Sequence, residues 1–378
     1  MKFRSLFFSA LCALMVTGGF TSCSDDDDDS PKFVDVSVAD GVFVINEGSY
    51  FSNINGTVDY LDYNRQAITN DVLANTYTLG GTPNSAIIVN DILYIACADE
   101  NRIAIIDAKN LIAAQRMITV TAPRELATDG FYLYVTSQAG TVSKIDLTSH
   151  TIVNTTDVIG DRLEGIAVRD GYLYVCNSCK EVADPSTGYS TWQYNTNLVK
   201  LNADNMQKVG DITVAANPNQ IISDGKNLYL ASWGDYDKTG ATVQRIDTDD
   251  QVTVIGAGQK IAYDDHKLYI INTIYDANYQ EVNSYKVLNL NTNQTTDFWG
   301  DTSLIFSPCA IGVDPLTHDV FITSYRAGDY GYADYTGSGY VVVYSNTNKY
   351  FQNATTQFQT GVGPGTLVFY SHTESVKK

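Results

Sequence analysis

One sequence unit is repeated along most of this chain, and residues 123–158 contain a full copy of it. The copy has four short runs of β-forming residues that are separated by turn residues such as Asp129-Gly130. Four runs of this kind predict a small antiparallel sheet. The same frame returns at Pro83 and at Pro218. A four-stranded sheet repeated about every 40 to 45 residues is typical of a β-propeller, so we expect an all-β fold.

The copies of the unit predict the number of blades. Complete units begin near Pro83, Pro123, Leu163, Pro218, Gln259 and Pro308. Two partial units remain, because residues 42–72 hold only a second, third and fourth strand and residues 363–369 hold only a first strand. Pairing the two ends of the chain completes a seventh blade and removes free sheet edges. We therefore expect one seven-bladed propeller over residues 40–372, followed by a tail at 373–378.

Five of the second strands contain a Leu-Tyr pair. The pairs are Leu93-Tyr94, Leu133-Tyr134, Leu173-Tyr174, Leu228-Tyr229 and Leu268-Tyr269. Adjacent side chains on a strand point to opposite faces, and both faces of a blade meet a neighbouring blade. These tyrosines are therefore predicted to belong to the core. The carboxylates of the Asp-Gly pairs are interpreted as turn residues.

The N-terminal residues have the features of an export signal. Residues 1–22 begin with Lys2 and Arg4 and continue into an apolar stretch that is too short to span a membrane. Cys23 follows small residues, which resembles a bacterial lipoprotein signal, so we expect Cys23 to be acylated. An ordinary secretory signal is the alternative. The five aspartates that follow cannot pack, so residues 23–39 are predicted to form an acidic, solvated tether.

The units differ mainly in the connection between their second and third strands. This connection is minimal in the unit at Pro123 and long in five other units, at residues 48–55, 180–196, 234–240, 275–283 and 326–339. In a propeller these connections share one face, here called the loop face, with the links from each fourth strand to the next blade. Insertions on one face of a repeat protein typically mark its binding face.

The long connections are rich in Tyr and Trp, which combine a flat apolar surface with a polar tip. Such side chains suit a bulky ligand that carries amides or hydroxyls. For any single tyrosine, packing of a loop onto the rim is the alternative. The candidate ligand-binding residues are Trp192, Tyr194, Trp233, Tyr236, Tyr275, Tyr325, Arg326, Tyr330 and Tyr335, together with Arg124 and Glu164. Tyr325, Arg326, Tyr330 and Tyr335 are expected to form the main cluster, because Arg326 directly follows a second strand.

Catalysis has little support in the sequence. All four histidines are predicted to lie off the loop face, so we expect neither a His-based nucleophile nor a metal ion there. Acidic pairs such as Asp235 with Asp237, or Glu47 with Glu164, have the residue types of a glycosidase but no distinguishing spacing. The net charge of −19 and the lack of a basic cluster disfavour nucleic acid as a partner. We expect a protein that is not an enzyme and needs no cofactor.

Four cysteines belong to the predicted propeller. Cys176 and Cys179 form a C-x-x-C at the end of a second strand, and no second C-x-x-C completes a zinc site. Whether these two cysteines form a local disulfide is left open, since exported proteins meet oxidising conditions. Cys97 and Cys309 occupy strand positions that are normally buried.

Three features together suggest a family: Phe-Val-Ile-Asn-Glu-Gly-Ser at residues 43–49, Asn-Gly-Thr at 55–57, and the repeated Leu-Tyr pairs. They resemble the YncE-like propeller lipoproteins of Bacteroidetes, over the whole mature chain. The overall layout is similar to members that capture cobalamin at the cell surface and pass it to a TonB-dependent outer-membrane transporter.

This resemblance implies a corrinoid ligand, a lipid-anchored position on the outer leaflet of the outer membrane, and that transporter as a partner. Two other functions remain open. In a glycan-binding protein, Trp192 and the tyrosines would stack on sugar rings. In a propeller that only docks a partner protein, the aromatic face would be a protein interface.

Overall fold

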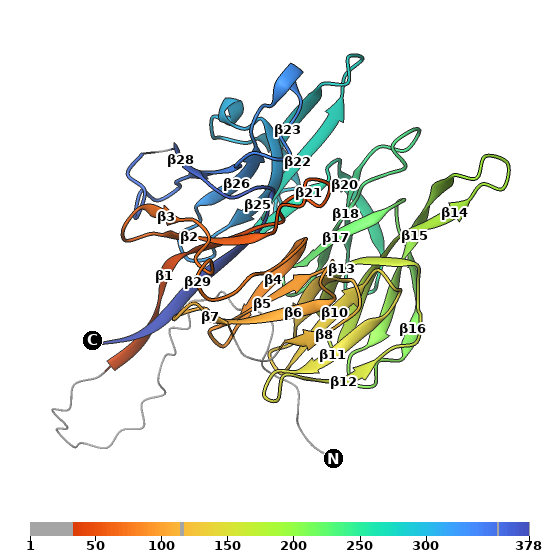
Figure 1. Cartoon of the computed structure of the whole chain (residues 1–378), viewed down its shortest axis with the longest axis horizontal. Helices are drawn as coiled ribbons and strands as arrows, with labels where there is room; N and C mark the ends of the chain where they lie inside the picture. Colours follow the sequence, from red (N-terminus) through yellow and green to blue (C-terminus); the bar gives the residue numbers. More distant parts are fainter. Residues whose placement is uncertain (1–32, 114–116, 354, 378) are drawn as a thin grey trace.

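The structure is a computed structural model that describes residues 33–113, 117–353 and 355–377. The described residues form seven antiparallel sheets arranged as the blades of a propeller, which confirms the predicted fold (Figure 1). Helical structure in these residues is limited to two short 3-10 turns, η1 (Thr302–Leu304) and η2 (Asp329–Gly331). The predicted signal, Cys23 and the aspartate run lie outside the described residues.

The strands of each blade follow one another outward from the propeller axis in chain order, except that the first strand of blade 1 comes from the C-terminus. Blade 1 consists of β29 (Pro364–Lys377), β1 (Phe33–Asn46), β2 (Thr57–Asp62) and β3 (Ala67–Thr69). Blade 2 consists of β4 (Pro83–Val89), β5 (Ile92–Cys97), β6 (Arg102–Asp107) and β7 (Ile112–Ala113), and β8 (Ile118–Thr119) also pairs with β6. Blade 3 consists of β9 (Pro123–Thr128), β10 (Tyr132–Ser137), β11 (Val142–Asp146) and β12 (Thr151–Thr155).

The other four blades follow the same order. Blade 4 consists of β13 (Arg162–Arg169), β14 (Tyr172–Ala183), β15 (Ser190–Asn202) and β16 (Lys208–Thr213). Blade 5 consists of β17 (Pro218–Ser223), β18 (Leu228–Ser232), β19 (Thr242–Ile246) and β20 (Val252–Gly256). Blade 6 consists of β21 (Lys260–Asp264), β22 (Lys267–Tyr275), β23 (Glu281–Asn289) and β24 (Gln294–Asp297). Blade 7 consists of β25 (Ser307–Val313), β26 (Val320–Tyr325), β27 (Tyr340–Tyr344) and β28 (Thr355–Gln359).

The ring is closed by the two ends of the chain, as the partial units predicted. β29 pairs with β1 in antiparallel register, with Val368 opposite Phe43 and Thr366 opposite Ile45. The first strands contact one another in the unbroken circle β29, β4, β9, β13, β17, β21, β25 and back to β29. Each blade therefore has a neighbour on both faces, and no blade is left with an open face.

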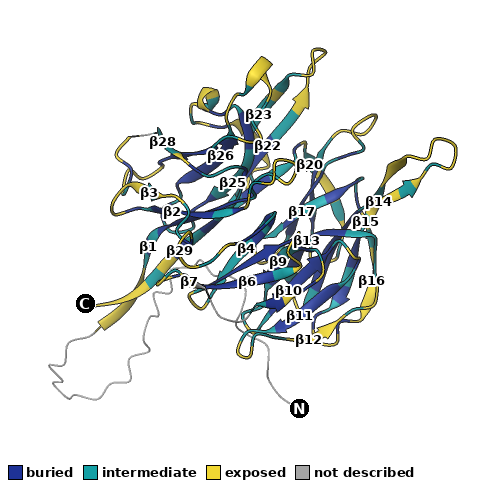
Figure 2. Ribbon diagram, viewed as in Figure 1, coloured by how far each residue is buried: buried dark blue, intermediate teal, exposed yellow. Residues whose placement is uncertain are grey.

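The β1–β29 pairing continues beyond the propeller as a two-stranded ribbon. Phe33 pairs with Lys377 and Ala39 with Ser371, and the end of the ribbon is exposed (Figure 2). Residues 33–39, expected in the tether, and 373–377, expected in the tail, are therefore β-structure. The two segments satisfy each other's backbone groups. Val34, Val36 and Val38 alternate with Asp35 and Ser37, but residues 33–37 are all exposed, so this alternation has no buried face.

The second strands carry the core. The Leu-Tyr tyrosines Tyr94, Tyr134, Tyr174, Tyr229 and Tyr269 are all buried, as predicted. Turn residues satisfy the hydroxyls of two of them: the Tyr134 hydroxyl donates to Asp129 at 2.8 Å, and that of Tyr229 to Asp224 at 2.8 Å. The same two carboxylates accept backbone N–H groups of their own turns. Each aspartate thus fixes a hairpin and satisfies a buried phenol.

Two of the predicted insertions are hairpins and not irregular loops. β14 and β15 remain paired from Tyr172–Asn202 out to Ala183–Ser190, so most of the insertion at 180–196 is strand. β22 and β23 remain paired out to Tyr275–Glu281. Both hairpins project from the body of the molecule (Figure 1). Alternation of side chains along paired strands therefore decides which of their aromatic residues face the same way.

Candidate functional site

The loop face is held together by backbone hydrogen bonds between the two kinds of connection that form it. Gly56 N–H donates to Gly80 O at 2.8 Å, and Gly339 N–H donates to Gly361 O at 2.8 Å. In each pair, one partner lies between a second and a third strand, and the other lies in a link between blades. The insertions therefore share one face with the links, as expected.

In six of the seven blades, a β-bulge lies in the first strand at this face. Two residues of the first strand lie opposite one residue of the second: Asn84 and Ser85 face Ala96, for example, and Asn219 and Gln220 face Ala231. These six pairs are Asn84-Ser85, Arg124-Glu125, Glu164-Gly165, Asn219-Gln220, Cys309-Ala310 and Gly365-Thr366. In blade 6 the equivalent place is occupied by Gln259-Lys260, where Lys260 pairs with Ile271 and Gln259 N–H donates to Ile271 O at 3.0 Å. The seven pairs together are here called the bulge ring. Bulges redirect side chains and are common beside functional sites. Here they place a ring of polar groups around the propeller axis.

Glu47 takes the place of the side chain that the bulge of blade 1 lacks. A Cβ atom on Gly365 would lie 2.3 Å from Oε1 of Glu47. Glu47 is held there by its backbone N–H, which donates to Gly363 O at 2.7 Å. A side chain at position 365 would therefore displace the Glu47 carboxylate from this place.

The charged groups of the ring influence one another across the axis. Arg124 Nε lies 2.7 Å from Oε2 of the buried Glu164, so these two predicted residues form an ion pair with each other. Burial raises the pKa of Glu47, with the charges of Arg124 and Lys260 acting against it. Burial also raises the pKa of Glu125 to about 7 and lowers the pKa of Lys260. The site thus contains carboxyl and ammonium groups whose charged forms are disfavoured by desolvation.

One group of predicted aromatic residues lies over blades 4 to 6. The rings of Tyr194 and Tyr236 meet edge to face, with centroids 5.7 Å apart. Trp192 is 46 % exposed, and the Arg162 guanidinium lies 5.0 Å from its ring centroid. The indole of Trp233 donates to Gln259 O at 3.0 Å, which joins blade 5 to the Gln259-Lys260 pair of blade 6. These rings form one part of the aromatic surface of the site.

A second group surrounds a hollow between blades 6 and 7. The hollow has a volume of about 860 Å³ and is bounded by the β22–β23 hairpin, the link at residues 301–306 and the β26–β27 connection. Tyr275 and Tyr335 line it and are both more than half exposed. Tyr335 packs against Tyr325, with ring centroids 4.8 Å apart. Tyr275, Tyr325 and Tyr335 therefore continue the aromatic surface over blades 6 and 7.

The predicted cluster around Arg326 is only partly assembled. Tyr325 and Tyr335 are in contact, but the Arg326 guanidinium lies 5.2 Å from the ring centroid of Tyr340, the first residue of β27. Tyr325 and Arg326 are consecutive residues, and their side chains contact different residues. The two side chains therefore do not form a single binding anchor. Tyr330 is 93 % exposed, and its backbone has a positive φ of 60°.

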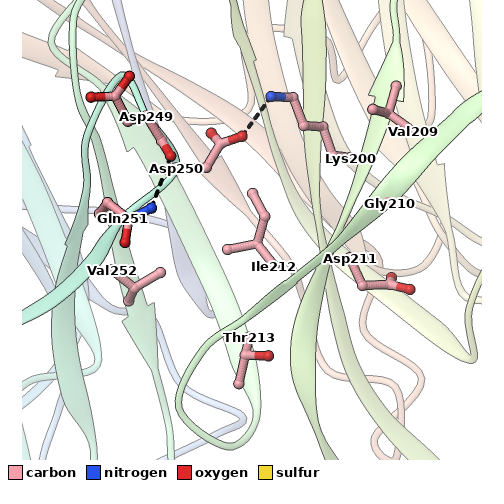
Figure 3. Close-up of a pocket in the computed structure, with 10 residues that line it drawn as sticks. All are labelled: Lys200, Val209, Gly210, Asp211, Ile212, Thr213, Asp249, Asp250, Gln251 and Val252. Carbon is pink, nitrogen blue, oxygen red and sulfur yellow. Dashed lines mark hydrogen bonds and ion pairs between the residues drawn. The ribbon is translucent and has the colours of Figure 1, made fainter.

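A hollow of about 510 Å³ lies away from the loop face, between the outer strands of blades 4 and 5 (Figure 3). Its charged residues already serve the contact between these blades. Lys200 Nζ lies 2.6 Å from Oδ2 of Asp250, and Arg169 Nη2 lies 2.7 Å from Oδ1 of the same carboxylate. We interpret this hollow as part of a blade junction and not as the ligand site.

The histidines lie off the loop face, as predicted, and three of them have a local partner. His318 Nδ1 lies 2.8 Å from Asp264, His372 Nδ1 lies 2.8 Å from Asp40, and His150 Nε2 lies 3.0 Å from the Tyr94 hydroxyl. The fourth, His266, is exposed in the turn between β21 and β22. Within the described parts of the chain, no three His, Cys, Asp or Glu residues are close enough to hold a metal ion.

The four cysteines of the propeller are free thiols. Burial raises the pKa of Cys176 well above its usual value, so this thiol is not a nucleophile at neutral pH. Cys97 is buried as predicted, whereas Cys309 is only half-buried, because the bulge of blade 7 brings it to the axis.

The sequence candidates did not include Glu125 and Lys260. Both occupy the second position of a pair in the bulge ring, and the same position holds Ser, Gly, Gln, Ala and Thr in other blades. The signal that identifies them is the place directly before the apolar part of a first strand. This position can be recognised in the sequence only when the seven units are aligned through their second strands.

These features define the class of protein: a seven-bladed propeller in which one built-up face surrounds a polar ring at the axis. The chain belongs to the family described as "Domain of unknown function (DUF5074)", whose model matches residues 40–370. A comparison with curated proteins finds no match.

Solved structures share the fold at low sequence identity. Hydrazine synthase of Kuenenia stuttgartiensis is 15 % identical with a TM-score of 0.59, over 78 % of this chain and 95 % of that chain. A protein of Bacteroides fragilis provisionally named a 6-phosphogluconolactonase is 13 % identical with a TM-score of 0.57, over 88 % of this chain and 98 % of that chain. At these identities the likeness supports the propeller fold alone.

Proposed function

We propose that this protein is a cell-surface binding protein that captures cobalamin or a related corrinoid on its loop face. The observation that carries the proposal is the arrangement of that face, where two neighbouring groups of aromatic side chains form a surface over blades 4 to 7, next to the bulge ring. A corrin is a broad, partly apolar disc fringed by amides. The aromatic surface suits the disc, and the Asn, Gln, Glu and Lys side chains of the ring suit the amides.

The proposal includes the wider role of YncE-like lipoproteins of the BtuG type, which pass cobalamin to a TonB-dependent outer-membrane transporter. It describes a binding protein and not an enzyme, because all four histidines have positions away from the loop face. Asp235 accepts N–H groups from Asp237, Lys238 and Thr239, as expected for a turn residue. Glu164 is engaged by Arg124. Neither acidic pair is therefore poised for acid–base chemistry.

The binding role predicts that Tyr275→Ala combined with Tyr335→Ala weakens cyanocobalamin binding about thirtyfold or more. That factor corresponds to about 2 kcal/mol, the usual loss when an aromatic anchor is truncated. Both side chains are largely exposed and line the hollow between blades 6 and 7, so the double variant is expected to keep its fold. Isothermal titration of the purified protein measures the effect, and His266→Ala on the opposite face is the control.

The titration also separates the competing functions. Binding of cyanocobalamin by the parent and not by the double variant supports the proposal. A parent that ignores corrinoids but binds a polysaccharide, with loss in the double variant, replaces the corrinoid with a glycan. Exposed Tyr275, Tyr335 and Trp192 are suited to stacking on sugar rings, which is why a polysaccharide panel belongs in the experiment.

The proposed anchoring predicts that Cys23→Ala moves the protein from the membrane fraction to the soluble fraction. The physical reason is the loss of the acyl chains, which would be the anchor of the chain to the bilayer. In the described residues, no helix is long and apolar enough to cross a membrane. Fractionation followed by protease treatment of intact cells is the measurement. Protection of the parent until the cells are lysed would refute the surface position.

A further inference from the structure

Two charged groups near the propeller axis lack a hydrogen-bonding partner within the chain. Within the described residues, neither Lys260 Nζ nor the Glu47 carboxylate forms a hydrogen bond or an ion pair. Lys260 Nζ lies 5.8 Å from the ring centroid of Trp233. The other charged pair of the ring behaves differently, because Arg124 and Glu164 satisfy each other at 2.7 Å.

Both side chains with these unpaired groups are half-buried. Burial lowers the pKa of Lys260 and raises the pKa of Glu47, and each group acts electrostatically on the other. A charged group that is already partly withdrawn from water and has no hydrogen bond within the chain can bind a ligand group at a lower desolvation cost. Lys260 is the first residue of the first strand of blade 6, and the Glu47 carboxylate lies beside Gly365 of the first strand of blade 1, so both groups are presented to a ligand at the axis.

The ligand group must satisfy two opposite requirements. An ammonium only donates hydrogen bonds, and a carboxylate only accepts them. A primary carboxamide meets both requirements with its carbonyl oxygen and its NH2 group, and it adds no further charge to be desolvated. A simple anion is repelled by Glu47, and a simple cation is repelled by Lys260. A zwitterion meets both requirements but brings two more charges out of water, which costs more than the burial of a neutral amide.

The chain itself contains carboxamides in the same ring. The Asn84 amide donates to Glu125 Oε1 at 3.4 Å, which is an amide-to-glutamate contact of the proposed kind. The Gln220 carboxamide donates to Ile261 O at 3.0 Å and accepts from Ile261 N–H at 2.8 Å. One carboxamide can therefore satisfy a donor and an acceptor together at this level of the propeller.

We infer that Lys260 and Glu47 form a subsite for a primary carboxamide arm of the ligand, with the carbonyl toward Lys260 and the NH2 group toward Glu47. This inference rests on the proposed function, since the amide-fringed corrinoid supplies such arms. The aromatic side chains would bind the body of the ligand, and Lys260 and Glu47 at the axis would bind one of its amide side chains.

The test compares cyanocobalamin with cobalamin derivatives in which one side-chain amide is hydrolysed to a carboxylate. One of these derivatives has lost the amide that binds the subsite in cyanocobalamin. The full-length parent protein is expected to bind cyanocobalamin at least about tenfold more tightly than this derivative, because the new carboxylate faces Glu47. Glu47→Gln is expected to abolish this preference. If Glu47 served only folding, its substitution would not abolish a preference between two ligands. The comparison therefore measures ligand recognition separately from stability.

A second variant tests the other half of the subsite. Lys260→Met is expected to weaken cyanocobalamin binding about tenfold or more through loss of one charge-assisted hydrogen bond. Lys226→Met, at an exposed turn on the opposite face, is the matched control. If the parent binds cyanocobalamin but shows no amide preference, and both variants keep its dissociation constants, this inference alone fails. A parent that binds no corrinoid overturns the proposed function, and this inference with it.

Discussion

A chain that ends at Val362 is expected to lose cooperative folding, or to melt at least about 10 °C below the parent. The deleted β29 is the first strand of blade 1 and contacts the first strands of both neighbouring blades, β4 and β25. It contributes the buried side chains of Val368 and Tyr370, each worth about 1.5–3 kcal/mol on burial. Its removal also leaves backbone groups of β1 unpaired. These losses are comparable to the net stability of a typical domain.

A shorter deletion provides the control for this experiment. A chain that ends at Ser371 keeps the part of β29 within the propeller and loses only the outer ribbon, which is mostly exposed. We expect this variant to melt within about 2 °C of the parent, since exposed positions contribute little. Thermal melts followed by circular dichroism compare the three chains. Closure by β29 would be refuted by a chain ending at Val362 that melts within a few degrees of the parent.

The fold could be predicted because the same sequence pattern is repeated in each blade. Seven units with the same order of turns and apolar runs specify the blades, and the two unmatched ends specify the closure between β29 and β1. The outer ribbon was not predictable in the same way. Val34, Val36 and Val38 do alternate with polar residues, but residues 373–377 are mostly polar and neither segment belongs to a repeated unit, so their pairing lay outside the pattern that specified the blades.

The candidate site was predictable only in outline. Differences in connection length identified the loop face, and composition identified its aromatic residues. The axis was harder to predict, because Glu47, Glu125 and Lys260 come from three separate blades, and Glu47 acts electrostatically on the other two only when the ring closes. The bulges add a further difficulty, since an extra residue changes the direction of the side chains that follow. The direction of Arg326 toward Tyr340 also depends on local alternation that connection lengths do not reveal.

Asp250→Asn is expected to lower the free energy of unfolding by about 3 kcal/mol at pH 7, because it leaves a buried guanidinium without its counter-charge. The side chain of Arg169 is only 2 % exposed, and Asp250 Oδ1 accepts from its Nη2 at 2.7 Å and from the Tyr174 hydroxyl at 2.9 Å. Oδ2 accepts from Lys200 at 2.6 Å. Asparagine keeps the size of the side chain and tolerates the positive φ of 60° at this position, so the variant removes mainly the charge.

The pH dependence of this variant follows from the pKa of Asp250. Burial opposes ionisation, but hydrogen bonds from Lys200 and Tyr174 and the charges of Lys200 and Arg169 lower the pKa below its usual 3.8. A lowered pKa means that the stabilisation is present above about pH 3.8 and is lost as the pH falls through the lower folded-state value. The difference between parent and Asp250→Asn in urea unfolding is therefore expected to be largest near neutral pH and to shrink in acid. The exposed neighbour variant Asp249→Asn should stay within about 0.5 kcal/mol of the parent. Equal stability of Asp250→Asn and the parent at pH 7 would show that this carboxylate does not hold blades 4 and 5 together.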